Sequence, residues 1–299
     1  MGLKIEIFTF RFVISLIGLV GNLILIVSIL KIPHLKTFEI FLLGLAVSNL
    51  EGILIVDIYD FIIIIKSWTS SLSMWSCNTL RSLTVTGETA TILFTMLISV
   101  FRYQKLRDVE TRVNLPVAMD KVRTALAMSG SSMLLAVLFG MPVYAMNLDG
   151  HMLNYTRNDS CPPDFFQCPK NYCPVLNRAY KYLFLLICIL LPLFVVTVTS
   201  CFIIRILRFR QRAVAPPPVR PTHHHGKKTS AFQRSTTAVL AAMIIFQLDW
   251  TVYLVLHLVL DPYSFSSWSE TEFFITTTYS TISPYIYGMG NNLFSVKHF

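Results

Sequence analysis

The chain has 299 residues, of which 54% are hydrophobic and only 14% are charged, and its mean hydropathy is +0.60. Soluble domains carry about 25% charged residues, so this composition excludes an ordinary water-soluble domain. A formal net charge of +9 occurs in nucleic-acid-binding proteins, but membrane proteins also collect Lys and Arg on their cytoplasmic side. We therefore expect a protein surrounded by membrane lipid, with no nucleic acid as a partner.

Seven apolar stretches are long enough to cross a bilayer, because about 20 helical residues span its hydrocarbon core. They cover residues 8–30, 38–65, 77–103, 124–146, 180–206, 236–260 and 272–290. Too few residues precede the first stretch for a cleavable signal peptide, so we expect it to act as a signal anchor. The sequence therefore predicts an all-α membrane protein, with a single seven-helix transmembrane domain over residues 1–299.

The third stretch, residues 77–103, carries a polar stripe. At about 100° per residue, its polar side chains fall within an arc of roughly 80°: Arg81, Thr84, Glu88, Thr91, Thr95, Ser99 and Arg102. An ionisable group in mid-membrane costs several kcal/mol without a partner, so this helix is expected to lie centrally with its stripe facing protein. Glu88 and Arg102 are the functional candidates; the alternative is a polar core that only holds helices together.

The loops differ in charge from one side of the membrane to the other. Most of the 25 Lys and Arg residues lie after the first, third and fifth spans and in the C-terminal tail. The positive-inside rule therefore predicts an extracellular N-terminus, a cytoplasmic C-terminus and a basic cytoplasmic loop at 207–235. The loop 147–178 then lies outside, where glycosylation sequons at Asn154 and Asn158 and three cysteines suit an oxidising compartment.

Four cysteines fall on the predicted extracellular side: Cys77, Cys161, Cys168 and Cys173. Four cysteines allow three pairings, so their connectivity stays open. A bond from Cys77 to the loop would hold the loop over the mouth of the bundle, and the other two loop cysteines would then close a small ring. Of the three loop cysteines, Cys168 is the expected partner of Cys77.

Short recognisable sequence motifs occur in every predicted span except the fourth. They are Gly21-Asn22, the run from Leu45 to Leu50, Cys77, Phe101-Arg102-Tyr103, Pro192, Phe246 with Trp250 and Tyr253, and the run from Ser283 to Tyr287. Together they resemble the rhodopsin-like G-protein-coupled receptors. The chain length, the run from Ser99 to Gln104 and the Ser-Pro-Tyr-Ile-Tyr-Gly ending most resemble the vomeronasal type 1 receptors and the fish olfactory receptors related to class A.

This resemblance implies a chemosensory receptor, of the pheromone or odorant kind, in the plasma membrane of chemosensory neurons. Such a receptor binds a small molecule within the bundle and activates a heterotrimeric G protein. The residues that the resemblance assigns to G-protein contact and to the switch are Arg102, Tyr103, Trp250, Pro284 and Tyr287. The family's acid before the arginine is Phe101 here, so we expect the inactive state to be less restrained.

The N-terminus is too short for a ligand-binding domain, so the pocket is expected within the bundle. Candidate lining residues lie in the outer halves of their spans: Arg11, Asp57, Asp60, Arg81, Thr84, Glu88, Lys181, Tyr182, Tyr253 and His257. Both signs of charge occur, so the charge of the ligand stays undecided. The alternative is that these groups pair with one another, and Glu88 needs such a partner, from the ligand, Lys181 or His257.

Other function classes have weaker support in the sequence. Another divergent rhodopsin-like or bitter-taste-like receptor has the same size, although bitter-taste receptors typically lack the Cys77 and Arg102 landmarks. A small-solute transporter would use the buried acids, but the hydropathy has no inverted repeat and no matched pair of broken helices. No nucleophile motif indicates an enzyme, and the histidines at 223–225 have no second ligand cluster, so no metal site and no cofactor are expected.

Overall fold

The computed structural model describes residues 2–66, 74–111, 120–146, 164–213, 223–265 and 267–294, and all regular structure within these ranges is helical. The long helices are α1 (Gly2–Leu30), α2 (Thr37–Lys66), α3 (Met74–Thr111), α4 (Val122–Gly140), α6 (Val175–Phe184), α7 (Leu191–Ala213), α8 (His223–Val259) and α9 (Trp268–Gly290). A 3₁₀ turn, η2 (Met141–Tyr144), extends α4, and a π-helical turn, η3 (Leu185–Leu190), joins α6 to α7 as one rod. The predicted seven-helix bundle is confirmed.

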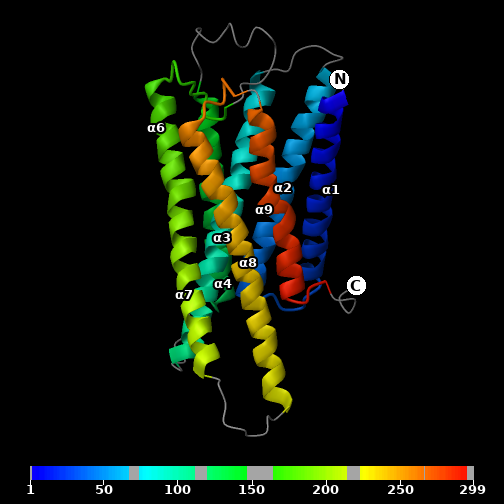
Figure 1. Cartoon of the computed structure of the whole chain (residues 1–299), viewed down its shortest axis with the longest axis vertical. Helices are drawn as coiled ribbons and strands as arrows, with labels where there is room; N and C mark the ends of the chain where they lie inside the picture. The colour runs from blue at the N-terminus through cyan, green and yellow to red at the C-terminus, as the bar shows by residue number, and fades with distance from the viewer. Residues whose placement is uncertain are drawn as a thin grey trace.

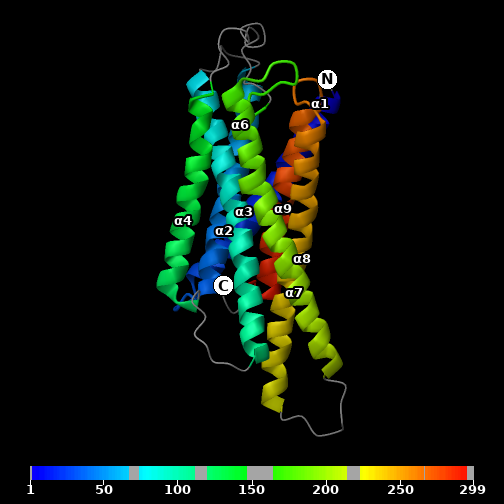
Figure 2. The ribbon, with the colours of Figure 1, turned by 90° about the vertical axis from the view of Figure 1, so that its left-hand side faces the viewer.

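The helical rods lie side by side, and the start of α1 and the end of α9 lie at opposite ends of the bundle (Figure 1). We call the end that carries residue 2 the N-terminal mouth and the other end the C-terminal mouth. In α3, 72% of the most apolar window is buried, against 17% in α4, which lies at the edge of the bundle (Figure 2). The predicted central position of the third span therefore holds, since α3 packs against α2, α4 and α7.

Six of the described helical segments are apolar enough to cross a membrane: 6–30, 37–59, 76–108, 122–144, 175–209 and 233–259. The helix that falls short is α9, whose 23 residues, about 34 Å long, match the bilayer in length. Its Ser, Thr, Tyr and Glu side chains lower its hydropathy, and many of them face the interior of the bundle. Helix α9 therefore contributes much of the polar interior.

Two prolines leave backbone carbonyl groups without their usual partners. Pro284 has no N–H to donate to the carbonyl of Ser280, and the side-chain amide of Asn22 on α1 donates to that oxygen instead, at 3.0 Å. Pro192 lies just after the π-helical turn η3, where the ladder of backbone hydrogen bonds is already shifted. The Asn22 contact fastens α1 to α9 in the middle of the bundle.

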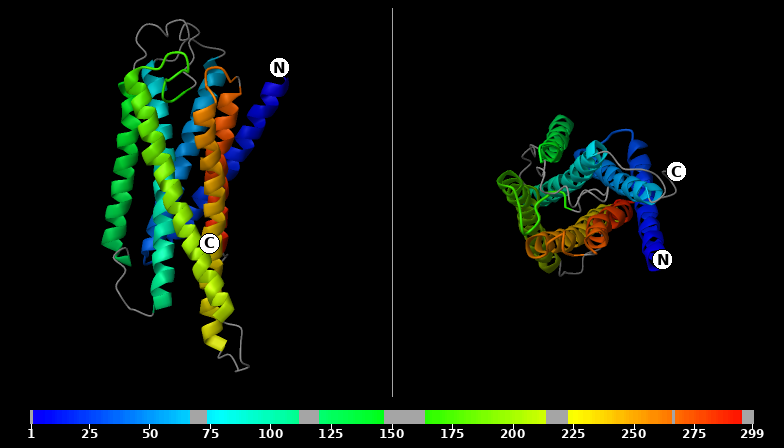
Figure 3. Two further views of the ribbon diagram at one scale, coloured as in Figure 1. Left: turned by 60° about the vertical axis from the view of Figure 1, so that its left-hand side comes forward. Right: turned by 90° about the horizontal axis from the view of Figure 1, so that it is seen from above.

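Residues 164–174 cross the N-terminal mouth (Figure 3) and contain a disulfide between Cys168 and Cys173. Cys77 is also disulfide-bonded, so the predicted Cys77–Cys168 pairing is wrong. A tight turn brings the Cα atoms of Cys168 and Cys173 to 4.5 Å, within the range that a disulfide requires. Cys161 and both sequons, at Asn154 and Asn158, lie outside the described residues, so glycosylation stays a prediction.

Candidate functional site

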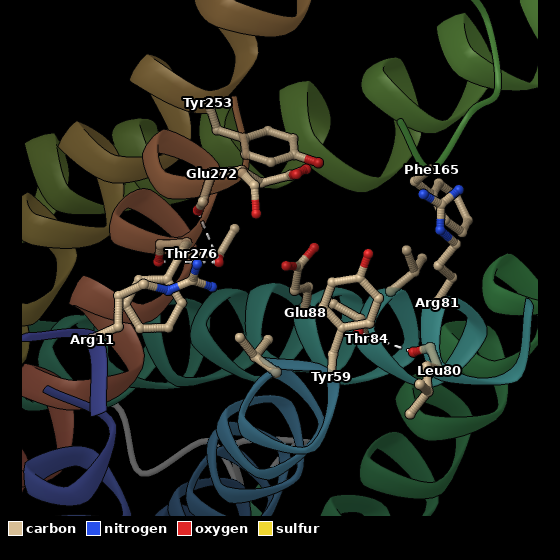
Figure 4. A pocket seen from close by; sticks show the side chains of 14 residues that line it. Arg11, Tyr59, Leu80, Arg81, Thr84, Glu88, Phe165, Tyr253, Glu272 and Thr276 are labelled. Carbon is tan, nitrogen blue, oxygen red and sulfur yellow. Dashed lines mark hydrogen bonds between the residues drawn. The ribbon is translucent and has the colours of Figure 1, made fainter. Parts of the chain in front are cut away.

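A cavity of about 310 Å³ opens inside the bundle, in the half nearer the N-terminal mouth (Figure 4). This volume lies at the lower end of the range for small-molecule sites, about 300 to 1,000 Å³. Helices α1, α2, α3, α8 and α9 and the loop at Phe165 supply its walls. The lining residues are Arg11, Val56, Tyr59, Leu80, Arg81, Thr84, Val85, Glu88, Phe165, Tyr253, Ser269, Glu272, Phe273 and Thr276.

One face of α3 forms the side of the cavity that bears both signs of charge. Arg81, Thr84 and Glu88 follow one another at intervals of three and four residues, which places them on the same face of the helix. Behind this face, α3 approaches α2 closely, since a Cβ atom on Gly87 would lie 3.2 Å from the backbone of Gly52. The close contact at Gly87 fixes the position of the neighbouring Glu88.

Two carboxylates point into the cavity, from Glu88 on α3 and from Glu272 on α9 (Figure 4). Trp268 donates its indole N–H to one carboxylate oxygen of Glu272 at 3.0 Å, and Nε2 of His257 lies 3.7 Å from the other. Within the described ranges, Glu88 makes no hydrogen bond and no ion pair. An uncompensated carboxylate in mid-membrane is costly, so Glu88 is suited to contact a ligand.

Two guanidinium groups lie on opposite sides of Glu88 (Figure 4). Arg81 donates from Nη1 to the backbone carbonyl of Asp164 at 2.7 Å. Arg11 lies over the ring of Phe273, 4.2 Å from its centroid, and interacts electrostatically with Asp57. The cavity therefore presents positive charge at both sides and negative charge between them.

The segment 164–174 forms a lid that Asp164 holds in shape. The buried Asp164 carboxylate accepts the backbone N–H groups of Phe166 and Cys168, each at 3.1 Å. Burial raises the pKa of Asp164, while the positive charges of His257 and Lys181 and the two N–H groups oppose that shift. Together with the Arg81 contact, these bonds fasten the lid to the top of the cavity.

A second polar cluster lies at the C-terminal mouth. Nη2 of the buried Arg102 donates to Oγ of Ser235 at 2.6 Å and to Oδ1 of Asn291 at 3.2 Å, and Ser235 donates to the same Asn291 oxygen at 2.6 Å. The Arg102 guanidinium also lies over the ring of Phe38, 3.7 Å from its centroid. Neutral side chains and an aromatic ring from α2, α8 and the end of α9 therefore hold Arg102, where Phe101 supplies no acid.

A row of side chains runs from the cavity to Tyr287, whose backbone carbonyl accepts a hydrogen bond from the side-chain amide of Asn291 in this cluster at 2.8 Å. Ring centroids along the row are 5.2 to 6.4 Å apart, as in ordinary aromatic packing, and hydroxyl contacts of 2.9 and 3.5 Å extend it. From the cavity downward, its members are Tyr253, Trp250, Phe246, Tyr279, Thr95 and Tyr287. These residues come from α3, α8 and α9, so a relative movement of the three helices must change the row.

An amide network lies beside this row. Asn49 donates to Asn22 at 3.3 Å and to Ser283 at 3.1 Å, and it accepts a hydrogen bond from Thr91 at 2.9 Å. These contacts tie four helices, α1, α2, α3 and α9, at one depth in the bundle. The neutral Asn49 is thus fully used in joining the helices.

A family model described as 7 transmembrane receptor (rhodopsin family) matches residues 21–287 of the 299. The chain belongs to this receptor family. No curated protein matches the chain. Membership makes the protein a multi-pass membrane receptor for signalling, in a family whose members are generally not enzymes. The matched residues include all of the cavity lining except Arg11 and all of the Arg102 cluster except Asn291.

Only some of the residues that the sequence predicts for the pocket lie together in the structure. Arg11, Arg81, Thr84, Glu88 and Tyr253 line the cavity, as expected. The other predicted lining residues have different positions or lie outside the description.

Asp57 and His257 are absent from the cavity wall, although Asp57 interacts electrostatically with Arg11 and His257 lies 3.7 Å from Glu272, and both of these partners line it. Lys181 is buried beneath the lid, with its ammonium 5.9 Å from the centroid of the Phe166 ring. The expectation for Tyr182 is wrong: its side chain is 57% exposed on the outer surface of α6, because it follows the inward-facing Lys181 by about 100° of helix rotation. The side chain of Asp60 lies outside the described residues.

Sequence reasoning missed the contribution of α9. Ser269, Glu272, Phe273 and Thr276 line the cavity, and their spacing of three and four residues is that of one helix face. The predicted seventh span begins at residue 272, whereas α9 begins at Trp268. The first turn of this face was therefore outside the predicted span, although its periodicity was available in the sequence.

The predicted switch residues all lie in the half of the bundle nearer the C-terminal mouth or in the row of side chains from Tyr253 to Tyr287. The ring of Tyr103 stacks on Phe202 of α7, with centroids 5.3 Å apart. Trp250 and Tyr287 belong to the row, and Pro284 lies inside α9. The roles of these residues in switching remain predictions.

Proposed function

We propose that this receptor is a chemosensory receptor of the plasma membrane, with the N-terminal mouth outside the cell. A small molecule of the odorant or pheromone class enters the cavity, and the receptor then activates a heterotrimeric G protein at the C-terminal mouth. The observation that carries this proposal is the cavity containing Glu88, which is connected by packed side chains to the Arg102 cluster. The proposed location, the plasma membrane of a chemosensory neuron, rests on the resemblance to the vomeronasal type 1 receptors.

In this mechanism the ligand changes the packing at the upper end of the row, where Tyr253 meets the cavity. Trp250, Phe246 and Tyr279 transmit the change, because packed side chains move as discrete alternatives and not by gradual deformation. Movement of α8 away from α3 then separates Ser235 from Arg102 and frees the guanidinium to contact the G protein.

The experiment that tests this proposal is a small-molecule screen in cells that express the full chain, with calcium or cAMP as the signal. We expect odorant-class ligands to give a signal that disappears when the cell lacks the G protein. A signal that persists without any G protein would favour a transporter, and a ligand class outside odorants would favour another divergent receptor.

Glu88→Gln is expected to shift the potency of polar agonists by tenfold or more, which is about 1.4 kcal/mol. Glutamine keeps the shape of the side chain but removes its negative charge. Dose-response curves of the two proteins, measured at matched surface expression, check this expectation. Glu39→Gln, which alters a carboxylate at the opposite mouth, is the control. Curves that overlay the wild type for every agonist would remove Glu88 from the ligand site.

Ser235→Ala is expected to raise ligand-independent G-protein activation several-fold. The substitution removes the Arg102 hydrogen bond at 2.6 Å, and hydrogen bonds to charged groups contribute about 1.5 to 3 kcal/mol. Basal nucleotide exchange in membranes measures the effect. Thr237→Ala is the matched control, since Thr237 lies two residues further along α8, is exposed and donates its hydroxyl to the carbonyl of Gln233 on the same helix. Unchanged basal exchange in Ser235→Ala would show that the contact does not restrain the inactive state.

A further inference from the structure

The cavity contains a carboxylate, that of Glu88, and a guanidinium, that of Arg81, which form no ion pair with each other or with another described residue. Glu88 also has no hydrogen bond among the described residues, and the hydrogen bond of Arg81 goes to a neutral backbone carbonyl, that of Asp164. Burying an uncompensated charge at membrane depth costs several kcal/mol. A ligand that brings a positive group to Glu88 and a negative group to Arg81 offsets both costs at once.

Glu272 strengthens the preference for a positive group beside Glu88. Its carboxylate points into the same cavity from α9 (Figure 4), and the His257 nitrogen at 3.7 Å is beyond hydrogen-bonding distance. An ammonium group has three N–H donors and no acceptor, so it can donate to both carboxylates. Tyr59 and Tyr253 add aromatic rings to the walls around this position, which also favours a cation.

Arg81, and not Arg11, is the guanidinium suited to an acidic group. Arg11 already interacts electrostatically with Asp57 and lies over the Phe273 ring. Arg81 has the neutral Asp164 carbonyl as its hydrogen-bond acceptor and keeps a planar fork of donors, which matches the two oxygens of a carboxylate.

The spacing along α3 limits the distance between the two charges of the ligand. Arg81 and Glu88 are seven residues apart on one face, a rise of about 10 Å along the helix. Each ion pair occupies about 3 Å, which leaves roughly 4 to 5 Å between the charges of the ligand. The longer arginine side chain leans toward the N-terminal mouth and increases that span. An α-amino acid, which carries both charges on one carbon, is too short to reach both groups.

We infer that the cavity binds a zwitterionic ω-amino acid, with its ammonium group between Glu88 and Glu272 and its carboxylate on Arg81. A chain of three to five methylene groups separates the two charges. This ligand class rests on the proposed function, because it assumes that the cavity is where the receptor takes its ligand.

The test uses purified full-length receptor in lipid nanodiscs and measures the midpoint of thermal unfolding, Tm. The probes are ω-amino acids with three, four and five methylene groups, with the monoamine and the monocarboxylate of each length and an α-amino acid as comparisons. We expect at least one ω-amino acid to raise Tm in a saturable way, at a concentration at least tenfold lower than any comparison probe. The inference is overturned if no ω-amino acid raises Tm, or if a matched monoamine or monocarboxylate is as effective.

A charge reversal gives a gain of binding that a folding defect cannot imitate. Arg81→Glu is expected to lose stabilisation by the ω-amino acid and to gain stabilisation by the diamine of the same length. Arg178→Glu makes the same reversal at an exposed position outside the cavity and should keep the wild-type preference. If Arg81→Glu responds to the ω-amino acid as the wild type does, Arg81 does not bind the carboxylate. If Arg81→Glu does not fold, the wild-type probe series decides alone.

Nucleotide exchange on a purified G protein separates this inference from the proposed function. Binding of an ω-amino acid without stimulated exchange contradicts the proposed function and leaves the ligand class standing. Stimulated exchange by a neutral or purely anionic ligand, with no binding of any ω-amino acid, contradicts the ligand class and leaves the proposed function standing.

Discussion

Arg102→Ala is expected to keep surface expression and ligand binding while reducing ligand-stimulated G-protein activation at least tenfold. The guanidinium lies at the C-terminal mouth, where Ser235, Asn291 and the Phe38 ring hold it. Alanine releases those restraints, but it also removes the cation that contacts the G protein in our proposal, and the second effect is the larger. Nucleotide exchange at saturating ligand measures the loss.

Ser235→Ala is the matched control for Arg102→Ala, because it loosens the same cluster and leaves the arginine in place. The two variants should therefore move in opposite directions, with basal exchange raised by Ser235→Ala and stimulated exchange lost in Arg102→Ala. Wild-type exchange in the Arg102 variant would show that the arginine only packs the mouth of the bundle.

Cys77→Ser is expected to lower stability by about 2 to 5 kcal/mol, the usual cost of removing a native disulfide. Cys77 is disulfide-bonded at the start of α3, and the lid at residues 164–174 covers the cavity beside it. Surface expression and Tm of the purified protein measure the effect. Normal trafficking and a normal ligand response in Cys77→Ser would mean that the bond is dispensable.

Two further cysteine variants serve as comparisons. Cys201→Ser alters a free, exposed cysteine on α7 and should leave Tm unchanged. Cys168→Ser opens only the short ring to Cys173, five residues away. It should lower stability less than Cys77→Ser, because a disulfide that closes a short loop removes less entropy from the unfolded chain.

The bundle and the central place of α3 could be predicted because their signals are strong and local. A continuous apolar run reports a membrane helix, and the polar stripe from Arg81 to Arg102 reports a helix surrounded by protein. The stripe also identified Glu88 and Thr84 as cavity residues. The apolar run and the spacing of the polar stripe both lie within a single helix, so both can be recognised in the sequence without knowledge of other helices.

The parts that failed depend on contacts between distant segments. The partner of Cys168 depends on the path of the lid, and the spacing of the four cysteines in the sequence does not predict that path. Tyr182 was assigned to the pocket by its depth in the span, but its facing depends on how α6 is rotated against its neighbours. Glu272 is the first residue of the predicted seventh span, but it was not assigned to the pocket, because its direction into the cavity depends on how α9 is rotated against its neighbours.

The neutral side chains that hold Arg102 could not be predicted from the sequence either. The absence of an acid at Phe101 predicted a weakly held arginine, yet Ser235 and Asn291, which are 133 and 189 residues further along the chain, converge on it. Residues of this kind acquire a function only when helices α8 and α9 bring them to the same mouth.

The central claim is that occupation of the cavity at Glu88 drives nucleotide exchange at the Arg102 mouth. Its most direct test is the rate of ligand-stimulated nucleotide exchange by purified receptor and G protein, compared for wild type, Glu88→Gln and Arg102→Ala over a full range of ligand concentration. We expect Glu88→Gln to shift the half-maximal concentration by tenfold or more with the maximum retained, and Arg102→Ala to lose the maximum with binding retained. Exchange that the ligand does not stimulate in the wild type, or that neither substitution alters, would contradict the claim.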